Sequence, residues 1–400
     1  MFMDKFDILI SGGGVAGLTA ASAFGAAGFI VCIVDPAPPV TDIADEGADL
    51  RTTAFLQPAR DFLDMAGLWE RLAPFATPLQ VMRMVDASGR GGGVRTTRDF
   101  DAADISDQPF GWNLSNWLLR REMVARLTEL DTVDFRTGVG FASMLTRSTG
   151  VKVRLSDGRA VQARLVIGAD GRGSPVRDAA GIGVRTTRYG QRALTFAVTH
   201  AAPHDNVSTE IHRAGGPFTL VPLPDHEGQP CSAVVWMCDA AEVTRLEAMQ
   251  EADFNAAATD RSAALYGPLK LATRRTSWPI ISQVADRIIA ERTALVAEAA
   301  HVMPPIGAQG LNTSLKDLTV LLEQAKQAGD RLGETPMLDA YARARMHDVR
   351  LRAVGIDALN RTSMAGMPAV QGLRARGIGA LHDIAPLRRA AMTLGLGAKG

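Results

Sequence analysis

Asp7-Ile-Leu-Ile-Ser-Gly12-Gly-Gly14-Val-Ala-Gly17 decides the fold of this chain, together with the later run Ile30-Val-Cys-Ile-Val-Asp35. Both runs contain the short, continuously apolar segments that are typical of buried parallel strands. The glycines between them predict a tight turn that leads into a helix. The order of strand, glycine turn, helix, strand and acid predicts a Rossmann-like α/β unit that binds a dinucleotide.

Each part of this pattern has a physical role in holding a pyrophosphate. Gly12 permits the tight turn, Gly14 lets a phosphate approach the backbone, and Gly17 lets the helix pack closely on the strand. The start of the helix offers N–H groups and the positive end of the helix dipole. The acid that ends the second strand would accept hydrogen bonds from ribose. The predicted dinucleotide contacts are Gly12, Gly14, Val15, Ala16, Gly17 and Asp35.

The bulk composition is that of an ordinary globular chain. It has 400 residues, of which 46% are hydrophobic and 22% charged, and its formal net charge is zero. The length favours two domains or one large domain with an insert, and the balanced charge gives no indication of a nucleic-acid partner. The three cysteines have no metal-like spacing, so we predict no metal site and a reducing, cytoplasmic compartment. Glycines interrupt the first apolar region, which argues against a signal peptide or a membrane span there.

A coarse set of further elements follows from the spacing of apolar residues. The pattern predicts helices over 53–65, 118–130, 242–265, 315–332 and 336–362, and strands over 81–86, 165–168, 218–223 and 292–297. The region around 178–280 is rich in strand-like runs, proline and glycine, whereas helices close the chain. We therefore expect an α/β part assembled from separated segments, with a β-rich part inserted into it.

Two further stretches are candidate cofactor-binding motifs, like the glycine turn. They are Ala169-Asp170-Gly171-Arg-Gly-Ser174-Pro-Val-Arg177 and Ala297-Glu298-Ala-Ala-His301-Val-Met-Pro304-Pro305-Ile-Gly307-Ala-Gln-Gly310-Leu-Asn312. With the glycine turn, they resemble the class A flavin monooxygenases, the p-hydroxybenzoate-hydroxylase-like superfamily, over nearly the whole chain. The stretches around Asp49-Leu-Arg51, Phe110 to Arg120, and Asn360 to Arg389 look like the aromatic hydroxylases of ubiquinone biosynthesis.

The resemblance implies a fold and its division into domains. The fold class is α/β with an α+β insert: a Rossmann-like FAD-binding domain, an inserted β-rich substrate domain and C-terminal helices. We predict a discontinuous FAD-binding domain over 1–75, 98–177 and 281–330, a substrate domain over 76–97 and 178–280, and a C-terminal helical segment over 331–400.

The resemblance also assigns residues around the flavin's phosphates and ribityl chain. Asp170 and Gly171 would support the pyrophosphate region and the approach of the nicotinamide donor. Glu298 would contact the ribityl or phosphate part, although the family usually has Asp or Asn there, after a glycine that is Ala297 in this chain. Two arginines, Arg51 and Arg120, match family arginines that reach the flavin. A one-residue change of register would put Arg121 in the place of Arg120.

The loop after the third motif is expected to lie against the flavin ring. Pro304 and Pro305 fix the backbone and supply no amide donors. Backbone N–H groups near the start of the next helix would stabilise the negative charge on the reduced ring. The predicted flavin contacts of this loop are Gly307, Gly310, Leu311 and Asn312, and its catalytic positions are Pro304, Pro305 and Gly310, through the backbone. His301 could act as a base, but we favour a core histidine that bonds the backbone behind the flavin.

The implied activity is aromatic hydroxylation. The resemblance implies FAD as cofactor, NAD(P)H as a transient reductant and dioxygen as co-substrate, with oxygen transferred from a flavin C4a-hydroperoxide to a phenolic ring. A dry site is expected between the loop over 304–310 and the strand over 218–224; the sequence assigns no side-chain base. The expected substrate is a polyprenylated phenol of ubiquinone biosynthesis. Two alternatives stay open: a soluble aromatic substrate, and a weakly active flavin-binding scaffold of a biosynthetic complex.

The C-terminal sequence bears on whether the protein meets such a substrate at a membrane surface. No stretch is apolar enough to span a membrane. Five basic residues against one acid, interspersed with apolar ones, follow position 370. Residues 370–400 therefore either rest on the inner membrane face as a basic amphipathic segment or pack as a helix on the FAD-binding domain.

Overall fold

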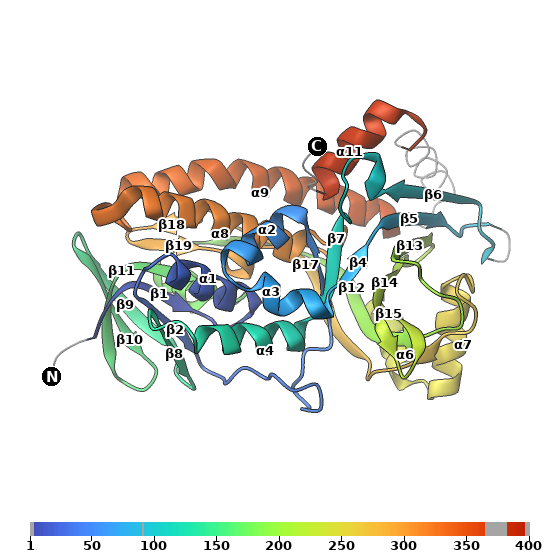
Figure 1. Cartoon of the computed structure of the whole chain (residues 1–400), viewed down its shortest axis with the longest axis horizontal. Coiled ribbons are helices and arrows are strands. Elements are labelled where there is room, and N and C mark those ends of the chain that lie inside the picture. The colour runs from blue at the N-terminus through green and yellow to red at the C-terminus, as the bar shows by residue number, and fades with distance from the viewer. Residues whose placement is uncertain (1–3, 90–91, 365–381, 397–400) are drawn as a thin grey trace.

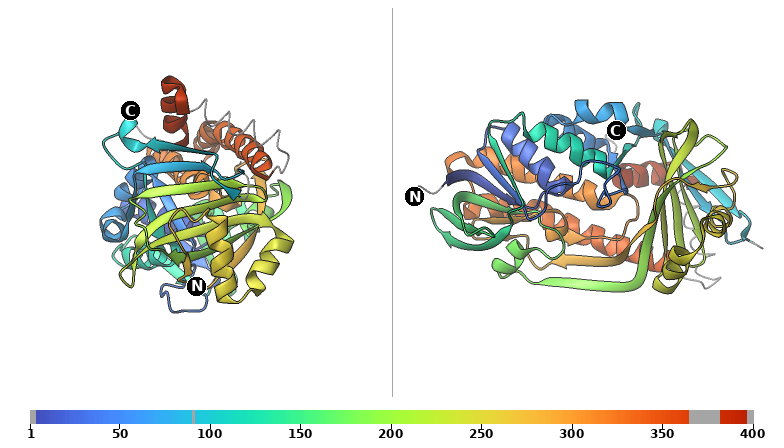
Figure 2. Two further views of the ribbon diagram at one scale, coloured as in Figure 1. Left: turned by 90° about the vertical axis from the view of Figure 1, so that its right-hand side faces the viewer. Right: turned by 90° about the horizontal axis from the view of Figure 1, so that it is seen from below.

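A computed structural model of the chain describes residues 4–89, 92–364 and 382–396 (Figure 1). Its helices and strands build two large sheets, which lie in the two halves of an elongated molecule and are joined by a small third sheet. The long strand β12 (Val184–Thr199) runs between the two halves (Figure 2).

An eight-stranded sheet carries the glycine turn. Its order is β18 (Ile289–Ala290), β19 (Thr293–Leu295), β11 (Ala160–Gly168), β1 (Asp4–Ser11), β2 (Val31–Asp35) and β8 (Val133–Thr137), with β10 (Gly150–Leu155) and β9 (Phe141–Arg147) added beside β11. The pairs from β19 to β8 are parallel, so the strands end at one edge. Ile8, Leu9 and Ile10 are fully buried, as the continuous apolar run of β1 predicts.

Helices cover this sheet and share its core. They are α1 (Val15–Ala26), α2 (Gln57–Met65), α3 (Trp69–Leu72), α4 (Asn116–Leu127), α5 (Pro175–Ala179), α8 (Gln309–Ala328) and α9 (Thr335–Met364). Phe24 of α1, Met123 of α4, Leu318 of α8 and Tyr341 of α9 belong to one buried cluster with the strands. The sheet is therefore built around a single apolar interior, which leaves its polar edges to form sites.

A nine-stranded, mostly antiparallel sheet forms the other half. Its order is β20 (His301–Val302), β17 (Thr276–Ala285), β12, β15 (Gln229–Asp239), β14 (Gly216–His226), β13 (Val207–Arg213), β5 (Val81–Asp86) and β6 (Thr96–Asp101), with β16 (Lys270–Leu271) beside β12. The helices α6 (Ala240–Ala248) and α7 (Glu251–Arg261) cover its outer face, where Phe218, Trp236 and Phe254 pack together. We call the opposite side the inner face; it carries Ala193, Met237 and Trp278.

A three-stranded sheet joins the two halves and corrects one expectation. It consists of β3 (Thr52–Leu56), β7 (Gly111–Ser115) and β4 (Thr77–Leu79). The helix expected over 53–65 begins only at Gln57, because residues 52–56 pair with β7 as a strand. Proline in its first turn favours a helix start at this point. The helix expected over 242–265 is likewise divided into α6 and α7.

The division into domains stays a prediction. Of the predicted boundaries, the one at 97/98 falls inside β6 and the one at 280/281 inside β17. Two strands of the nine-stranded sheet therefore contain residues from both predicted domains.

The described part of the C-terminal segment, residues 382–396, contacts residues in and next to β6 of the nine-stranded sheet. Most of the predicted amphipathic segment, residues 370–381 and 397–400, lies outside the described residues. In the described part, α11 (Ala385–Leu396) places Arg388 Nε 3.1 Å from Asp104 Oδ2, and Asp383 Oδ1 lies 3.4 Å from Arg98 Nε of β6. Arg98 and Asp104 both lie within residues 98–177, which the prediction assigns to the FAD-binding domain, so the expectation of a helix packed on that domain stays open for this part of the segment.

Candidate active site

The glycine turn lies at the carboxyl edge of the eight-stranded sheet. Gly12 has φ +110°, and a Cβ added there would lie 2.8 Å from the Cα of Asp170. A Cβ at Gly17 would overlap the carbonyl oxygen of Gly12. At Gly14, by contrast, nothing lies within 4 Å of an added Cβ, and α1 begins after it without a side-chain cap. The turn thus combines close packing below with open space at the helix start, which suits a phosphate.

Asp35 ties the end of β2 to this turn. Its Oδ2 accepts a hydrogen bond of 2.5 Å from the N–H of Gly13, and its Oδ1 accepts one of 2.9 Å from Ala37. Each carboxylate oxygen can accept a second hydrogen bond, so the same group can both hold the turn and bind ribose.

Asp170 joins the ends of two neighbouring strands beneath the turn. Its Oδ2 accepts hydrogen bonds from Ser11 Oγ at 3.0 Å and from the N–H of Val176 at 3.2 Å. Its Oδ1 is buried and has no partner. Burial raises the pKa of Asp170 above its usual range, since desolvation outweighs these hydrogen bonds. Gly171, at φ +81°, then turns the chain away from the strand.

The two predicted arginines meet at one carboxylate. Arg51 binds Asp49 through two hydrogen bonds, Nε to Oδ1 at 2.7 Å and Nη2 to Oδ2 at 2.6 Å. Asn116 Nδ2 lies 3.1 Å and Arg120 Nη2 3.9 Å from Asp49 Oδ2. Burial favours the neutral acid, but these partners outweigh it and lower the pKa of Asp49. The cluster therefore fixes two cations beside the sheet edge, and Arg51 lies 5.0 Å from the ring centre of Trp278.

The structure also distinguishes Arg120 from Arg121, the other candidate for the same contact with the flavin. Arg121 stacks on Trp117 and hydrogen bonds to Glu122, away from the Asp49 cluster. The Nε of Arg120 is buried and has no hydrogen-bond partner among the residues that the structure describes. Arg120 is thus the member of the pair that the fold brings to the other predicted residues.

Glu298 is the exposed residue of the short turn Ala297–Ala299 that follows β19. Ala297, which stands where the resemblance expects glycine, has φ +54°, a conformation that costs less for glycine. The pKa of Arg51 is raised chiefly by its hydrogen bond to Asp49, against burial, and in smaller part by the charge of Glu298. Glu298 therefore lies within electrostatic reach of the arginine cluster.

The proline-glycine loop connects β20 to α8. Pro304 is buried, while Pro305, Gly307 and Gly310 are exposed. The first turn of α8 has no side-chain cap, and nothing lies within 4 Å of a Cβ added at Gly310. The loop thus presents bare backbone at a helix start, as a flavin ring requires.

Asn312 docks the start of α8 on β3. Its Oδ1 accepts a hydrogen bond of 2.9 Å from the N–H of Leu56, and its Nδ2 donates to the carbonyl oxygens of Ala54 and Ala308, both at 2.7 Å. Its side chain therefore holds the loop against the small sheet, which leaves only its backbone and that of Leu311 for a ligand.

His301 is buried in an ionic network. Its Nε2 lies 2.6 Å from Asp317 Oδ2, and Arg345 Nε donates to Asp317 Oδ1 at 2.7 Å. All three side chains are at most 1% exposed. The expected core position is confirmed, and the partner at Nε2 is a carboxylate of α8.

The strand expected to wall the substrate site needs a correction. Phe218 belongs to the outer core under α6 and α7 and is fully buried there. Its neighbours Thr219 and Val221 occupy the inner face, because successive side chains of a strand alternate. Val221 packs near Leu56 of β3, and Ile306 of the proline-glycine loop packs against the cluster of Ala193, Met237 and Ile280. The inner face, rather than Phe218, therefore meets the loop.

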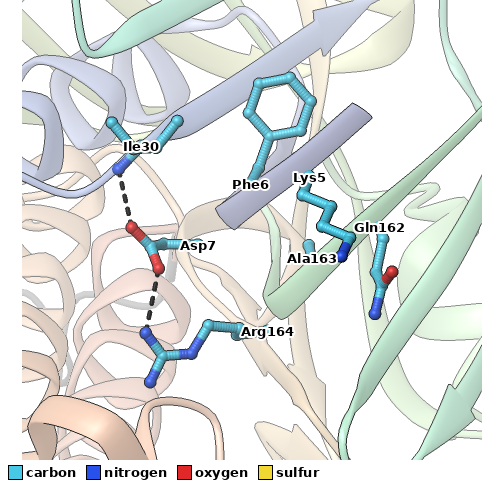
Figure 3. Close-up of a pocket in the computed structure, with 7 residues that line it drawn as sticks. All are labelled: Lys5, Phe6, Asp7, Ile30, Gln162, Ala163 and Arg164. Atoms are coloured by element: carbon cyan, nitrogen blue, oxygen red, sulfur yellow. Dashed lines mark hydrogen bonds and ion pairs between the residues drawn. The ribbon is translucent and has the colours of Figure 1, made fainter. Parts of the chain in front are cut away.

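One pocket lies far from these residues. It surrounds the amino-terminal half of β1 (Figure 3) and is lined by Lys5, Phe6, Asp7, Ile30, Gln162, Ala163 and Arg164. The carboxylate of Asp7 there accepts hydrogen bonds from the N–H of Ile30 and from Arg164, both at 3.0 Å. Since Asp7 and Arg164 there are paired with each other and the glycine turn lies at the other end of β1, we assign this pocket no role in the chemistry.

Two further searches cover the described residues only. No helix among them is long and apolar enough to cross a membrane. In the same part of the chain, no three His, Cys, Asp or Glu side chains gather in a way that could hold a metal ion.

Comparisons with known proteins agree with this geometry. Residues 5–352 match the family model described as FAD binding domain. The chain is 34% identical to a protein of Rhodospirillum rubrum named ubiquinone hydroxylase UbiL, over 98% of this chain and 89% of the relative. It is 26% identical to the 3-demethoxyubiquinol 3-hydroxylase of Escherichia coli, over 98% of each chain.

The fold is also that of solved flavoenzymes. The structure of p-nitrophenol 4-monooxygenase from Pseudomonas putida matches with a TM-score of 0.79 and 19% identity, covering 100% of both chains. The mutant structure of PqsL from Pseudomonas aeruginosa matches with a TM-score of 0.76 and 21% identity, over 90% of this chain and 97% of that one. The chain therefore belongs to the FAD-binding family of class A aromatic monooxygenases and is related to the ubiquinone hydroxylases.

Proposed function

We propose that this chain hydroxylates the phenolic ring of a polyprenylated intermediate of ubiquinone biosynthesis. The reaction converts a ring C–H, dioxygen, NAD(P)H and a proton into a ring C–OH, NAD(P)+ and water. The observation that carries the proposal is the similarity to the ubiquinone hydroxylase of Rhodospirillum rubrum, which extends over 98% of this chain.

The residues at the sheet edge fit FAD. When bound, FAD supplies the electron transfer and oxygen activation that no amino-acid side chain provides. The glycine turn would hold its pyrophosphate through the uncapped start of α1, with Asp35 on the ribose. Arg51, Arg120 and Glu298 would surround the ribityl and phosphate part, and the buried Nε of Arg120 that lacks a partner is available to it.

The proline-glycine loop would face the flavin ring. Backbone N–H groups at Gly310, Leu311 and Asn312 and the helix dipole of α8 would stabilise negative charge on the reduced ring. Ile306 and the inner face of the nine-stranded sheet would exclude water from the reacting centre. Asp170, which follows β11 and is hydrogen bonded to β1 and to the start of α5, would keep the floor of the site in place for the nicotinamide donor.

An assay with purified, FAD-loaded protein tests this function. We expect 2-prenylphenol to stimulate NAD(P)H oxidation and to be converted to a product with one additional oxygen, whereas unprenylated phenol should stimulate much less. Equal hydroxylation of unprenylated phenol would instead favour a soluble aromatic substrate.

A cellular experiment separates the enzyme from a scaffold. Deleting the gene should abolish quinone and accumulate a precursor short of one oxygen, as measured by mass spectrometry of lipid extracts. Complementation with Gly310→Trp, whose side chain would enter the open space expected for the flavin, should not restore quinone. Restoration by this variant would favour a scaffold in a biosynthetic complex.

We also propose peripheral contact with the cytoplasmic membrane face, where a prenylated substrate resides. Besides the predicted basic segment over 370–400, a separate feature of α9 supports this contact: Leu351 and Val354, one turn apart, are 65% and 69% exposed. Flotation with anionic phospholipid vesicles should decrease for a chain that ends at Val370 and for Leu351→Glu combined with Val354→Glu. Unchanged flotation of both variants would contradict membrane contact.

A further inference from the structure

A buried ionisable pair lies on the inner face of the nine-stranded sheet. Glu210 and His212 alternate along β13, so their side chains share that face, while Ile211 packs outward into the core under α6 and α7. Their side chains are 9% and 5% exposed, and His212 Nε2 lies 2.9 Å from Glu210 Oε1. An ionisable pair at this depth is costly unless something else binds it.

Within the described residues, the hydrogen-bonding capacity of this pair and of its neighbour Asp86 is not satisfied. Neither ring nitrogen of His212 has a hydrogen-bond partner, since the contact with Glu210 is out of line for one. On the neighbouring strand β5, Asp86 is 2% exposed and pairs in register with His212. Its Oδ1 accepts hydrogen bonds from Ser88, but its Oδ2 is buried without a partner. Buried polar atoms are nearly always paired, so three orphaned atoms in one place indicate a missing ligand.

Two other buried histidines show what a structural role looks like in this chain. His200 on the same half of the molecule bonds the carbonyl oxygen of Ala202 at 2.7 Å and Ser232 Oγ at 2.9 Å. His301 bonds Asp317. Among the buried histidines of the described ranges, His212 alone has both ring nitrogens without a hydrogen bond.

The pair lies close to the expected position of the flavin. Across the sheet, Glu210 pairs with Thr219, which pairs with Val235. Two strand spacings therefore separate Glu210 from Val235, about 10 Å. Val235 and Ile306 of the proline-glycine loop pack against the same apolar cluster. A substrate ring between the loop and β13 would have apolar neighbours and one polar group within reach.

We propose that His212, oriented by Glu210, binds the ring hydroxyl of the phenolic substrate. The carboxylate beside Nε2 favours the proton on that nitrogen, so Nδ1 is left as the acceptor for the hydroxyl O–H. Sharing this proton with Nδ1 raises the electron density of the ring, which favours attack by an electrophilic oxygen. The proton returns to the hydroxyl when the ring regains aromaticity, so the overall proton balance is unchanged. The inference rests on the proposed function and adds to it a residue for the reacting group.

The test compares a phenol with its methyl ether, which cannot donate a hydrogen bond. Binding of 2-prenylphenol and of its methyl ether to the FAD-loaded protein is measured by titration calorimetry. The wild type should prefer the phenol by about tenfold, the value of one hydrogen bond in a buried site. His212→Phe should lose this preference, and His212→Gln, which keeps an acceptor, should retain most of it. A phenol preference that persists in His212→Phe would overturn the proposal.

A matched control and a second variant keep the test decisive. His200→Phe removes an equally buried histidine whose bonds are internal, so it should lower the melting temperature but keep the tenfold preference. FAD content and melting temperature show which variants fold. If His212→Phe does not retain FAD, Glu210→Gln decides: a preference reduced about threefold supports the pair, and an unchanged one contradicts it. Failure of the proposed function is distinguishable, because the wild type would then bind the phenol without adding oxygen to it.

Discussion

The edge of the eight-stranded sheet and the inner face of the nine-stranded sheet present polar atoms to a ligand in different ways. At the sheet edge, the backbone at the glycine turn and at the start of α8 is left uncapped by side chains, and glycine keeps it accessible. On the inner face, the side chains of Glu210, His212 and Asp86 carry the polar atoms. The comparison teaches that a cofactor site made of backbone requires particular residues at fixed spacing, whereas a site made of side chains requires only that distant strands meet.

The largest effect on function, the loss of FAD binding, is expected at the glycine turn. Gly12→Ala places a Cβ against the backbone of Ala169 and Asp170 at φ +110°, so it should destabilise the apoprotein by about 2–4 kcal/mol and abolish FAD binding. Gly14→Ala has room for its Cβ, so the apoprotein should lose less than about 1 kcal/mol while FAD affinity falls about tenfold or more. Urea unfolding measures the stability of the two variants, and flavin absorbance measures their FAD binding. Normal FAD binding by Gly14→Ala would break the comparison, because the backbone would not be the binding group.

The sequence predicted the cofactor half because its requirements are local. Gly12 follows β1 and Asp35 ends the adjacent β2, as the spacing predicts, while Gly17 in α1 lies against the carbonyl oxygen of Gly12. It could not predict that residues 52–56 form a strand, because their partner β7 is more than 50 residues away. The same applies to Glu210 and His212: nothing in their own segment distinguishes an inner-face residue from an outer-face one.

A second test concerns a closed polar network. Arg345 is fully buried between Asp317 and Asp348, so Arg345→Met would leave a buried carboxylate with His301 as its remaining partner. We expect a loss of about 3–5 kcal/mol in the free energy of unfolding. Arg361→Met removes an ion pair on the same helix whose arginine is 63% exposed, and should leave the free energy of unfolding nearly unchanged. Equal losses in urea unfolding would show that the buried network does not hold α8 to α9.

This network also shows what sequence motifs do not predict, namely the partners of a buried polar residue. His301 follows a recognisable motif, so its burial was predictable, but its partners come from α8 and α9. Asp317 and Arg345 are polar residues at buried positions of two helices, and that break in the apolar pattern was the available signal. The identity of the pair depends on how the helices pack, which the spacing within either helix does not determine.

A smaller effect depends on pH. Burial disfavours the charged form of Asp348, but hydrogen bonds and charges from Arg345, Arg352 and Lys316 outweigh it and lower its pKa from 3.8 to about 2. Because the folded-state pKa lies below the unfolded one, the stabilisation is present above pH 4 and is lost as the pH falls toward 2. Asp348 is about a quarter exposed, so solvent screening reduces its contribution to about 1–2 kcal/mol.

Asp348→Asn should therefore be less stable than the wild type by that amount at pH 7. The difference in urea unfolding free energy between the two proteins should shrink below pH 4. A difference that is constant from pH 7 to pH 3 would show that the carboxylate acts through packing rather than charge.

The smallest effect lies where the chain departs from the pattern that it resembles. Ala297 has φ +54°, which glycine adopts at lower cost, so Ala297→Gly should stabilise the apoprotein by about 0.5–1 kcal/mol. Ala299, in the same turn, does not have a positive φ, and Ala299→Gly should destabilise by a similar amount. If Ala297→Gly raises the free energy of unfolding and Ala299→Gly lowers it, the backbone conformation at position 297 matters more than its side chain. If both variants are destabilised, the methyl group of Ala297, which is 7% exposed, stabilises the fold through packing by more than its strained φ costs. In that case a side chain also matters at this position, and the difference between the backbone-built sheet edge and the side-chain-built inner face becomes smaller.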